Sequence, residues 1–481
     1  MKFKNTLIPI LLIFALLLAQ SSFVYAGKRK RNTTRKKIER ILNKKIFNDA
    51  CVGIKIINLD KNKILFEKNS EKLFTPASTQ KLLTTSAALC FLPENYAFET
   101  KILSNGVAVD SVLRGDLIFR GGGDPLLTYA ELDSLLEIFV SLGINEIRGN
   151  IVGDVAWCDS NYFGKGWMWD DNPEPFMPYI SPLSLEEATV RIIVKPSAPY
   201  SLADIEILPD VPSIKIVNKI LTVSDDTTYF TLERNWRKND NTIFAEGFVS
   251  EFSEPDTTFL NIYAPAKVFL EAAKKSLETK GVKVRGKTIV KRNVPYVKEF
   301  LSFKRNIDTV IFRANKESDN LCAEMLFRAL GEELYGKPAT EKKGVAAIDS
   351  IITLLGRKPS AYTVVDGSGV SRYNLISPAL LVDLIKFLRT ERPRAYEKLI
   401  ASLPVMGVDG TLKERHKKGK AFGNARAKTG TMTAVSALVG ITKNRSGDTI
   451  LFAMMMQNFS ASVARIRLYQ DIITEILSNS R

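Results

Sequence analysis

The sequence predicts an α+β protein in which both ends of the chain form one helix-and-sheet domain, interrupted by a long β-rich insertion. Strand patterns occur near both ends, at residues 51–69 and 426–456. Between 96 and 300, short alternating stretches separated by turn residues indicate strands, and after residue 303 the apolar spacing becomes helical. With 481 residues, the chain is long enough for two or three domains with substantial cores.

The first residues predict export. MKFKN is basic, TLIPILLIFALLLAQ is apolar, and Val24-Tyr25-Ala26 has small residues at the outer positions that signal peptidase reads. We therefore expect a signal peptide over residues 1–26, cleaved near Ala26, and a periplasmic protein in a two-membrane bacterium. The apolar core is too short for a comfortable membrane span, and no cysteine follows it to carry a lipid anchor.

The chain is basic, with a formal net charge of +16 that falls by two when Lys2 and Lys4 leave with the signal peptide. The stretch KRKRNTTRKK supplies seven positive charges to an arm over residues 27–37, which we interpret as a solvated tether. A basic exported protein is attracted to anionic wall or membrane surfaces. Export argues against nucleic acid as a partner.

The remaining elements follow in order. A first helix is expected at 36–47, two strands joined by a tight turn follow, and the stretch TPASTQK then opens a helix that ends near Phe91. We predict an enzyme domain of residues 38–95 plus 301–481 and an insertion of residues 96–300, with one helix near 129–142. The chain ends with strands and a last helix.

The sequence offers no metal site and implies no cofactor. It has one histidine, His416, and four cysteines without a CxxC pair, so no zinc-ligand spacing is present. Export permits disulfides, but a core of this size does not need them. We favour buried free thiols over bridges.

The stretch TPASTQK raises the question of which group could take a proton from a serine when histidine is absent. Ser78 and Lys81 are three positions apart at a helix start, so they lie on one face and can touch. Lysine becomes a base when burial or a second cation lowers its pKa. Alone, this spacing is weak, because an ordinary helix start can also carry Ser and Lys.

Two further motifs strengthen the case. Ser318-Asp319-Asn320 lies in a helical region, and Lys428-Thr429-Gly430 opens a strand. The order S-x-x-K, S-D-N, K-T-G is the signature of serine penicillin-binding proteins and β-lactamases. Found together on a predicted exported chain with a single histidine, the three motifs indicate a serine acyl-transfer enzyme.

With these residues, the chain resembles the D-alanyl-D-alanine carboxypeptidase/endopeptidases of the class C low-molecular-mass penicillin-binding proteins. The resemblance covers nearly the whole mature chain and implies a serine β-lactamase/DD-peptidase-like fold with one or two β-rich subdomains inserted between SxxK and SDN. Further landmarks are GGGDPLLT, GWMWDD, VVDGSGVSRYNLISP, SLPVMGVDGTLKER and RAKTGTM.

The resemblance also implies roles. Ser78 would attack the penultimate D-alanine carbonyl of peptidoglycan stem peptides, Lys81 would be its base, and Ser318 would pass a proton to the departing amine. Asn320 would hold Lys81 and a substrate amide. Lys428 and Thr429 would bind the terminal carboxylate, Gly430 would also contact the substrate, and the backbone N–H groups of Ser78 and Thr431 would form the oxyanion hole. β-Lactams would acylate Ser78 as inhibitors.

For stem peptides with diaminopimelate, the resemblance implies further contacts at Asp154, Arg372 and Thr433. An acidic and a basic group together suit a zwitterionic side-chain end. The alternatives stay open: Asp154 as a turn aspartate, Arg372 as a surface salt bridge, and Thr433 as a variable position.

Two other functions compete with the DD-peptidase. A β-lactamase needs a dedicated deacylation group, and we find neither the Glu-containing loop of one β-lactamase class nor the Tyr-x-Asn of another. A non-catalytic wall-binding scaffold is expected to have lost Ser78, Lys81 or Lys428, and all three are present. The sequence does not separate carboxypeptidase from endopeptidase activity, because both share one chemistry.

Overall fold

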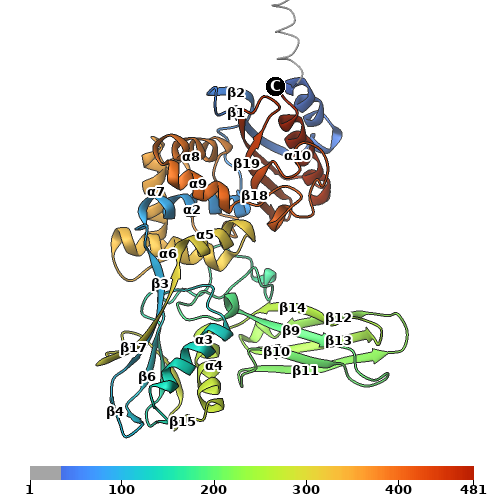
Figure 1. Ribbon diagram of the computed structural model, residues 1–481. Helices are drawn as coiled ribbons and strands as arrows, with labels where there is room; N and C mark the ends of the chain where they lie inside the picture. Colours follow the sequence, from blue (N-terminus) through green and yellow to red (C-terminus); the bar gives the residue numbers. More distant parts are fainter. Residues whose placement is uncertain (1–33) are drawn as a thin grey trace, which may run out of the picture. The chain divides into compact units, whose positions relative to one another are not determined.

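The structure is a computed structural model that describes residues 34–481 (Figure 1). The predicted signal peptide and most of the predicted basic arm lie outside the described residues; residues 34–37, assigned to that arm, open a helix over 34–42. The described chain forms two compact units. The first contains the chain up to Phe74, Ser377–Val382 and Val405–Arg481, and the second contains Thr75–Ile376 and Asp383–Pro404. The predicted division of the chain at residues 96 and 300 stays a prediction.

The first unit contains one five-stranded sheet in the order β18-β19-β20-β1-β2, with every neighbouring pair antiparallel. Its strands are β1 (Cys51–Asn58), β2 (Lys63–Lys68), β18 (Arg426–Met432), β19 (Val435–Lys443) and β20 (Thr449–Gln457). Asn58 and Asp448, which are 390 residues apart, hydrogen bond at 2.9 Å beside the β1–β20 pair. Segments from the two ends of the described chain are therefore neighbours in one sheet.

The core of the first unit explains its strand sequences. Strands β19 and β20 are buried along nearly their whole length, which is why they read as continuous apolar runs instead of alternating ones. Met454 and Met456 of β20 join one hydrophobic cluster with Ile38 from the helix at 34–42 and Ile473 from α10 (Val463–Ser478). The expected first helix at 36–47 is thus a shorter helix, followed by a 3₁₀ turn at Lys45–Phe47.

Helix α6 (Asn320–Tyr335) lies at the centre of the helical part of the second unit. It packs against α2 (Lys81–Phe91), α5 (Ile307–Lys316) and α7 (Glu341–Leu354). Every residue from Asn320 to Gly331 is buried, as expected of a helix surrounded by others. Helix α9 (Pro393–Ser402) packs against α2 and α5, and α8 (Pro378–Glu391) begins in the first unit and ends in the second.

The part of the second unit between α2 and α5 is rich in strands, as predicted. A five-stranded sheet has the order β16-β8-β6-β3-β17, and a four-stranded sheet has the order β15-β7-β5-β4. The strands are β3 (Ala97–Ser104), β4 (Val107–Val109), β5 (Val112–Arg114), β6 (Leu117–Arg120), β7 (Glu146–Ile147), β8 (Ile151–Asp154), β15 (Lys283–Val284), β16 (Thr288–Lys291) and β17 (Lys298–Asn306). Because β3 pairs with β17, the first and last strands of this part are neighbours.

Two three-stranded sheets, β10-β9-β14 and β11-β13-β12, complete this part. Their strands are β9 (Thr189–Lys195), β10 (Asp204–Leu208), β11 (Ile214–Val223), β12 (Tyr229–Arg234), β13 (Asn241–Ser250) and β14 (Asp256–Asn261). The predicted helix near 129–142 is α3 (Tyr129–Ser141), which begins with a capping box between Thr128 and Glu131.

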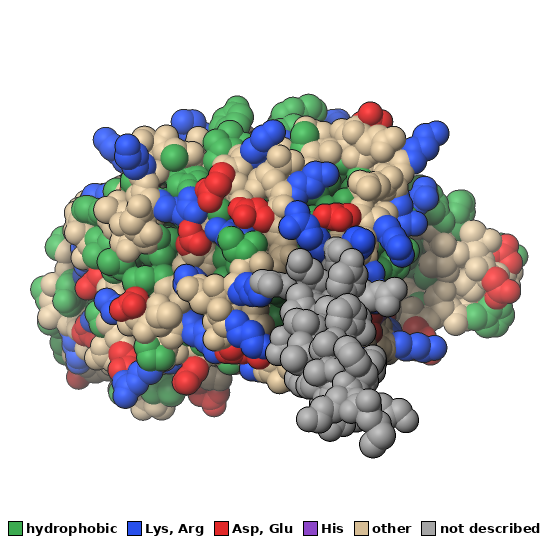
Figure 2. Space-filling view, turned by 90° about the horizontal axis from the view of Figure 1, so that it is seen from above, with side chains coloured by type: hydrophobic (Ala, Val, Ile, Leu, Met, Phe, Trp, Pro, Cys, Tyr) green, Lys and Arg blue, Asp and Glu red, His purple; other side chains and the backbone are tan. Residues whose placement is uncertain are grey.

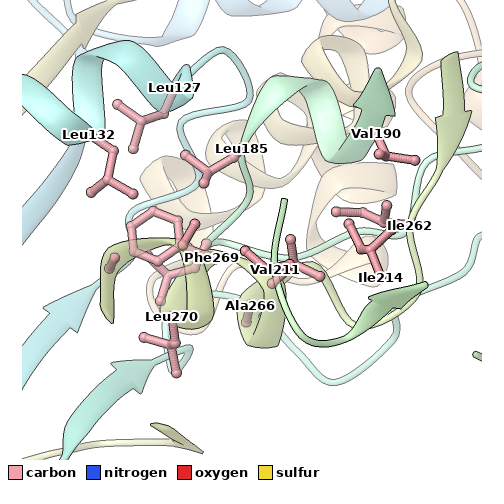
Figure 3. Packing of buried hydrophobic residues seen from close by; sticks show 14 of the residues in the cluster. Leu127, Leu132, Leu185, Val190, Val211, Ile214, Ile262, Ala266, Phe269 and Leu270 are labelled. Carbon is pink, nitrogen blue, oxygen red and sulfur yellow. The ribbon is translucent and has the colours of Figure 1, made fainter. Parts of the chain in front are cut away.

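A second helix in this part, α4 (Pro265–Thr279), was not predicted. Its apolar face holds Val268, Phe269, Ala272 and Leu277 at helical spacing, and all four are buried. Figure 3 shows Phe269 and Leu270 among side chains from other segments, such as Leu132 and Leu185, in one hydrophobic cluster. The expectation of a single helix between 96 and 300 was therefore wrong. The apolar spacing of α4 is helical, although the segments before and after it are strands.

The four cysteines are free thiols. Cys158 and Cys322 are buried, as we expected of all four, whereas Cys90 is half-buried and Cys51 is exposed. Along residues 34–481, no helix combines the length and the apolar character that a membrane crossing requires.

Candidate active site

The SxxK motif forms a short 3₁₀ turn, Ala77–Gln80, that runs directly into α2. Ala77 has a φ of +47°, a left-handed conformation that costs free energy for a residue with a side chain. Ser78 follows it and is half-buried, whereas the Lys81 side chain is fully buried. Lys81 Nζ lies 3.0 Å from Ser78 Oγ, so the structure brings the two predicted residues into contact.

Lys81 has two further partners. Its Nζ donates to Asn320 Oδ1 at 2.5 Å and to the Ser368 carbonyl at 2.7 Å. Burial lowers the pKa of Lys81 to about 8, although Asp319, Asp366 and Glu324 act in the opposite direction. A neutral amine has two N–H groups and one lone pair. If the two carbonyl-type oxygens take the N–H groups, the lone pair faces Ser78.

The SDN motif forms the link between α5 and α6. Ser318 is half-buried and has a left-handed φ of +66°, and Asp319 caps α6 by accepting a hydrogen bond from Cys322 N at 2.6 Å. Asn320 then begins the helix. Its Nδ2 donates to the Phe176 carbonyl at 2.5 Å, which leaves Oδ1 for Lys81. The strand-rich part of the unit thus fixes the orientation of the Asn320 amide.

A second strained segment lies near the SDN motif. Glu186, Glu187 and Ala188 all have left-handed φ values, of 51°, 58° and 59°. The Glu187 carboxylate accepts a hydrogen bond from Arg313 Nε of α5 at 2.7 Å. Burial and the charge of Asp319 raise the pKa of Glu187. Strain of this kind persists only where its surroundings enforce it.

The DGSG segment, residues 366–369, supplies the third partner of Lys81. The Asp366 carboxylate accepts hydrogen bonds from Gly369 N at 2.8 Å, Ser371 N at 2.6 Å and the Trp167 indole at 2.9 Å. Trp167 is only 7% exposed and belongs to the core, whereas Trp169 is 65% exposed.

Sequence reasoning recognised this segment as a landmark but assigned no role to Ser368 or to Glu324, which also contacts it. A backbone carbonyl carries no sequence signal. The carboxyl group of Glu324 did carry one, since it is a charged residue on the apolar helix that follows SDN.

The KTG motif lies on β18, an edge strand of the first unit. Lys428 is fully buried and its Nζ donates to the Thr429 carbonyl at 3.1 Å. Thr429 Oγ1 donates to Thr411 Oγ1 at 2.8 Å, and Thr431, which is exposed, accepts from Arg467 Nη2 at 2.8 Å. Apart from a bridge between Val405 and Arg426, the edge of β18 away from β19 has no strand partner among the described residues.

The three residues that the resemblance assigns to a diaminopimelate side chain, Asp154, Arg372 and Thr433, lie in different surroundings. Asp154 is 2% exposed, and its carboxylate accepts four hydrogen bonds, from the backbone N–H groups of three residues and from Arg120 Nε at 3.0 Å. It lines a cavity of ≈ 1090 Å³ that Ser78 and Lys81 do not line. Arg372 is exposed and interacts electrostatically with Asp171. Thr433 is exposed in the turn between β18 and β19. Within residues 34–481, no cluster of His, Cys, Asp and Glu is arranged to hold a metal ion.

The chain is similar to known proteins over most of its length. Residues 34–478 match the D-Ala-D-Ala carboxypeptidase 3 (S13) family. D-alanyl-D-alanine carboxypeptidase DacB of Haemophilus influenzae is 27% identical over 425 residues, which cover 87% of this chain and 88% of the relative. D-alanyl-D-alanine carboxypeptidase of Actinomadura sp. is 28% identical over 454 residues, covering 91% and 84%. The crystal structure of penicillin binding protein 4 from H. influenzae shares the fold, with a TM-score of 0.80 at 24% identity over 92% of this chain and 99% of that one.

Proposed function

Because the chain belongs to the D-Ala-D-Ala carboxypeptidase 3 (S13) family, we propose that it removes the terminal D-alanine from peptidoglycan stem peptides through an acyl-enzyme on Ser78. One observation carries the proposal. The buried Lys81 Nζ lies 3.0 Å from Ser78 Oγ, and its pKa is lowered to about 8. An amine in this state is a base of suitable strength for a serine hydroxyl near neutral pH.

The reaction proceeds in two stages. Ser78 Oγ attacks the carbonyl carbon of the penultimate D-alanine while its proton moves to neutral Lys81. The C–N bond then breaks, and the departing D-alanine amine receives a proton through Ser318. Water attacks the resulting ester, Ser78 regains its proton, and the shortened peptide leaves as a carboxylate.

The KTG strand has the chemistry to bind the substrate backbone and its terminal carboxylate. We assign the terminal carboxylate of the substrate to Lys428 and Thr429. We assign the oxyanion of the intermediate to the backbone N–H groups of Ser78 and Thr431, and Gly430 lies between Thr429 and Thr431 in the strand. Beyond the Arg426 bridge, the outer edge of β18 has no strand partner among residues 34–481, which supports this assignment, because an extended peptide can add to a sheet edge by backbone hydrogen bonds.

The same chemistry extends to two related reactions. Endopeptidase cleavage differs only in the leaving group, which is a cross-linked side chain instead of free D-alanine. A β-lactam also presents a strained amide to Ser78, but its leaving nitrogen stays tethered to the acyl group. The β-lactam adduct is therefore expected to outlast the natural intermediate.

Contacts to a diaminopimelate side chain remain proposals at Asp154, Arg372 and Thr433. The exposed Arg372 can reach a substrate directly, whereas Asp154 already accepts four internal hydrogen bonds. Replacing Arg372 by alanine is thus the sharper test. We expect Arg372→Ala to raise the KM for a diaminopimelate stem peptide more than it raises the KM for the matching lysine peptide.

We place the enzyme in the periplasm, where the predicted signal peptide would deliver it to its substrate. The positive net charge of the chain supports an attraction to the anionic wall or membrane surface.

The test is the intact mass of the mature protein after brief treatment with benzylpenicillin. We expect an adduct on the parent protein and none on Ser78→Ala, which should also lose D-alanine release by roughly 10⁴-fold or more. Ser86→Ala is a matched control, because Ser86 is a buried serine of α2, the helix that follows the Ser78 turn, and its hydroxyl has no hydrogen-bond partner among the described residues. Free protein with rapidly consumed drug would favour a β-lactamase, and free protein with intact drug would favour a wall-binding scaffold.

A further inference from the structure

Glu324 is a buried carboxylate beside the proposed active site. It lies four residues after Asn320 on α6, so both side chains lie on the same face of the helix. Glu324 is 1% exposed, and its Oε1 accepts hydrogen bonds from two consecutive backbone N–H groups, those of Gly367 at 3.0 Å and Ser368 at 2.9 Å. One carboxylate oxygen therefore fixes the orientation of the peptide units that enter Ser368.

The carbonyl of Ser368 is the group that contacts Lys81 Nζ at 2.7 Å. The same segment is held from the SxxK helix, because Thr84 Oγ1 donates to the Gly367 carbonyl at 2.7 Å. Gly369, with φ of +82°, lies so close to Ala77 that a Cβ would come within 2.0 Å of the Ala77 carbonyl oxygen. Glu324, the DGSG segment and the Ser78 turn are thus packed as one assembly.

We propose that Glu324 is a positioning residue of the acylation reaction, which acts through the Ser368 carbonyl to direct the lone pair of Lys81 at Ser78 Oγ. The proposal rests on the function proposed above. Neutral Lys81 donates one N–H to Asn320 and one to Ser368, and only then does its lone pair face the serine. If the Ser368 carbonyl turns away, the amine can rotate and the lone pair loses its direction.

Glu324 is a buried charged residue, and its ion pair shows that more than packing is needed to explain it. Its Oε2 accepts from Arg328 Nη1 at 2.9 Å, and both side chains are essentially unexposed. A buried ion pair of this kind often stabilises a fold no better than apolar residues do, so stability alone does not explain it. Arg328 Nε and Nη2 have no hydrogen-bond partner among the described residues, which makes the pair costly to keep.

The groups that face Lys81 are Asp319, Cys322 and Glu324 around α6 and Asp366 from the DGSG segment. Each of them favours the protonated lysine, while burial disfavours it. Removing the negative charge of Glu324 therefore shifts Lys81 deprotonation to lower pH. Moving the carboxylate without removing its charge leaves that pH unchanged.

Two substitutions in the full mature chain test the proposal. Glu324→Asp keeps the charge but withdraws the acceptor by one methylene. Glu324→Gln keeps the reach but removes the charge. The measurement is the rate constant of acylation by benzylpenicillin, followed by intact mass, as a function of pH. Glu333→Gln, an exposed residue further along α6, is the control.

For Glu324→Asp we expect the plateau rate at high pH to fall on the order of 10- to 100-fold with the midpoint of the pH profile unchanged, as for a misaligned base. For Glu324→Gln we expect the midpoint to move to lower pH with the plateau close to that of the parent protein. A purely structural role would lower the melting temperature of both variants and leave the plateau rate of folded Glu324→Asp unchanged. That outcome would overturn the proposal.

If Glu324→Asp does not fold, Thr84→Val provides the second test. It is nearly isosteric and removes the hydrogen bond to the Gly367 carbonyl, next to Ser368, so we expect a lower plateau with an unchanged midpoint. An unchanged plateau in folded Thr84→Val would also contradict the proposal. Failure of the proposed function is distinguishable, because then the parent protein itself would form no adduct or Ser78→Ala would still form one.

Discussion

At the level of single residues, the proposed chemistry depends on Lys81, because burial disfavours its charged form. Its Nζ contacts three oxygens, those of Ser78, Asn320 and Ser368, and the acidic groups around it only partly offset the loss of water. The result is a lysine that titrates near pH 8 instead of 10.5. A group with this pKa changes both reactivity and stability over an accessible pH range.

Reactivity should follow the neutral fraction of Lys81. Below its pKa of about 8 the amine is mostly protonated, so the acylation rate constant should rise about tenfold per pH unit and level off above it. Stopped acylation reactions with benzylpenicillin between about pH 6 and about pH 9 measure this profile. A flat profile would show that Lys81 is not the base whose protonation limits acylation.

Stability should depend on the same proton. The pKa of Lys81 is lower in the folded protein, so the unfolded chain binds more protons between pH 8 and 10.5 and stability rises with pH across that window. The penalty is fully present below pH 8 and amounts to about 3 kcal/mol. Urea unfolding at several pH values should show this slope for the parent protein and its absence in Lys81→Met. If the free energy of unfolding changed with pH in the same way in the parent protein and in Lys81→Met, the lowered pKa of Lys81 would be contradicted.

The sequence predicted part of this site at residue level. The i, i+3 spacing was sufficient to place Ser78 beside Lys81, because helical geometry is local. Asn320 could be named only from the family motif, since it reaches Lys81 from 239 residues away. Ser368 was not predicted, because it contacts Lys81 through its backbone carbonyl. Glu324 was not predicted, because it contacts the backbone of Gly367 and Ser368 and does not contact Lys81 itself.

At the level of elements, the close approach of two loops aligns the nucleophile. The DGSG segment passes directly over the turn that carries Ser78, and Gly369 permits this both by its left-handed φ and by having no side chain. Trp167 ties the same segment to the strand-rich part of the unit through Asp366.

Gly369→Ala should therefore be far more damaging than an ordinary substitution of a left-handed glycine. Gly356→Ala is the matched control, because Gly356 has a φ of +73° and nothing within 4 Å of its would-be Cβ. The control should cost about 1–2 kcal/mol for the backbone conformation alone. Gly369→Ala should cost several kcal/mol in urea unfolding and also slow acylation. Equal costs would mean that the Ala77 contact is not tight.

The Trp167 connection can be tested separately. Trp167→Phe keeps the aromatic packing and removes the hydrogen bond to Asp366, which leaves one buried acceptor short of a donor. We expect a loss of about 1–3 kcal/mol in the free energy of unfolding. Trp169→Phe serves as the control, because Trp169 is largely exposed and no hydrogen bond to its indole is described. An equal change in both variants would remove Trp167 from this role.

Elements were predictable where their patterns are regular. The strands of the first unit and α3 were predicted from apolar patterns and turn residues, whereas α4, within a strand-rich region, was not predicted. The order and register of the sheets could not be predicted, because they depend on pairings between segments that are far apart in the chain.

At the level of the whole molecule, seven positive charges lie in the stretch KRKRNTTRKK, and further Lys and Arg side chains lie on the surface of the described residues. Figure 2 shows Lys and Arg side chains distributed over one face with Asp and Glu among them. Such a distribution attracts an anionic polymer without specific docking.

Binding to insoluble peptidoglycan should therefore weaken with salt. Raising NaCl from about 0.05 M to about 0.5 M shortens the range of electrostatic attraction, so the fraction that sediments with the wall material should fall. Peptidoglycan with amidated carboxyl groups is the control and should bind weakly at every salt concentration. Retention that ignores both changes would indicate specific recognition instead of charge attraction.

The pairing of β1 with β20 also sets the time at which the sheet of the first unit can form during synthesis. A polypeptide that is made from its N-terminus presents β1 and β2 long before β19 and β20 arrive. Contacts this remote in sequence form slowly, and unpaired strand edges invite aggregation while they wait. The KTG strand belongs to the same late segment. The enzyme should thus stay inactive until β18, β19 and β20 have been made and have joined the sheet.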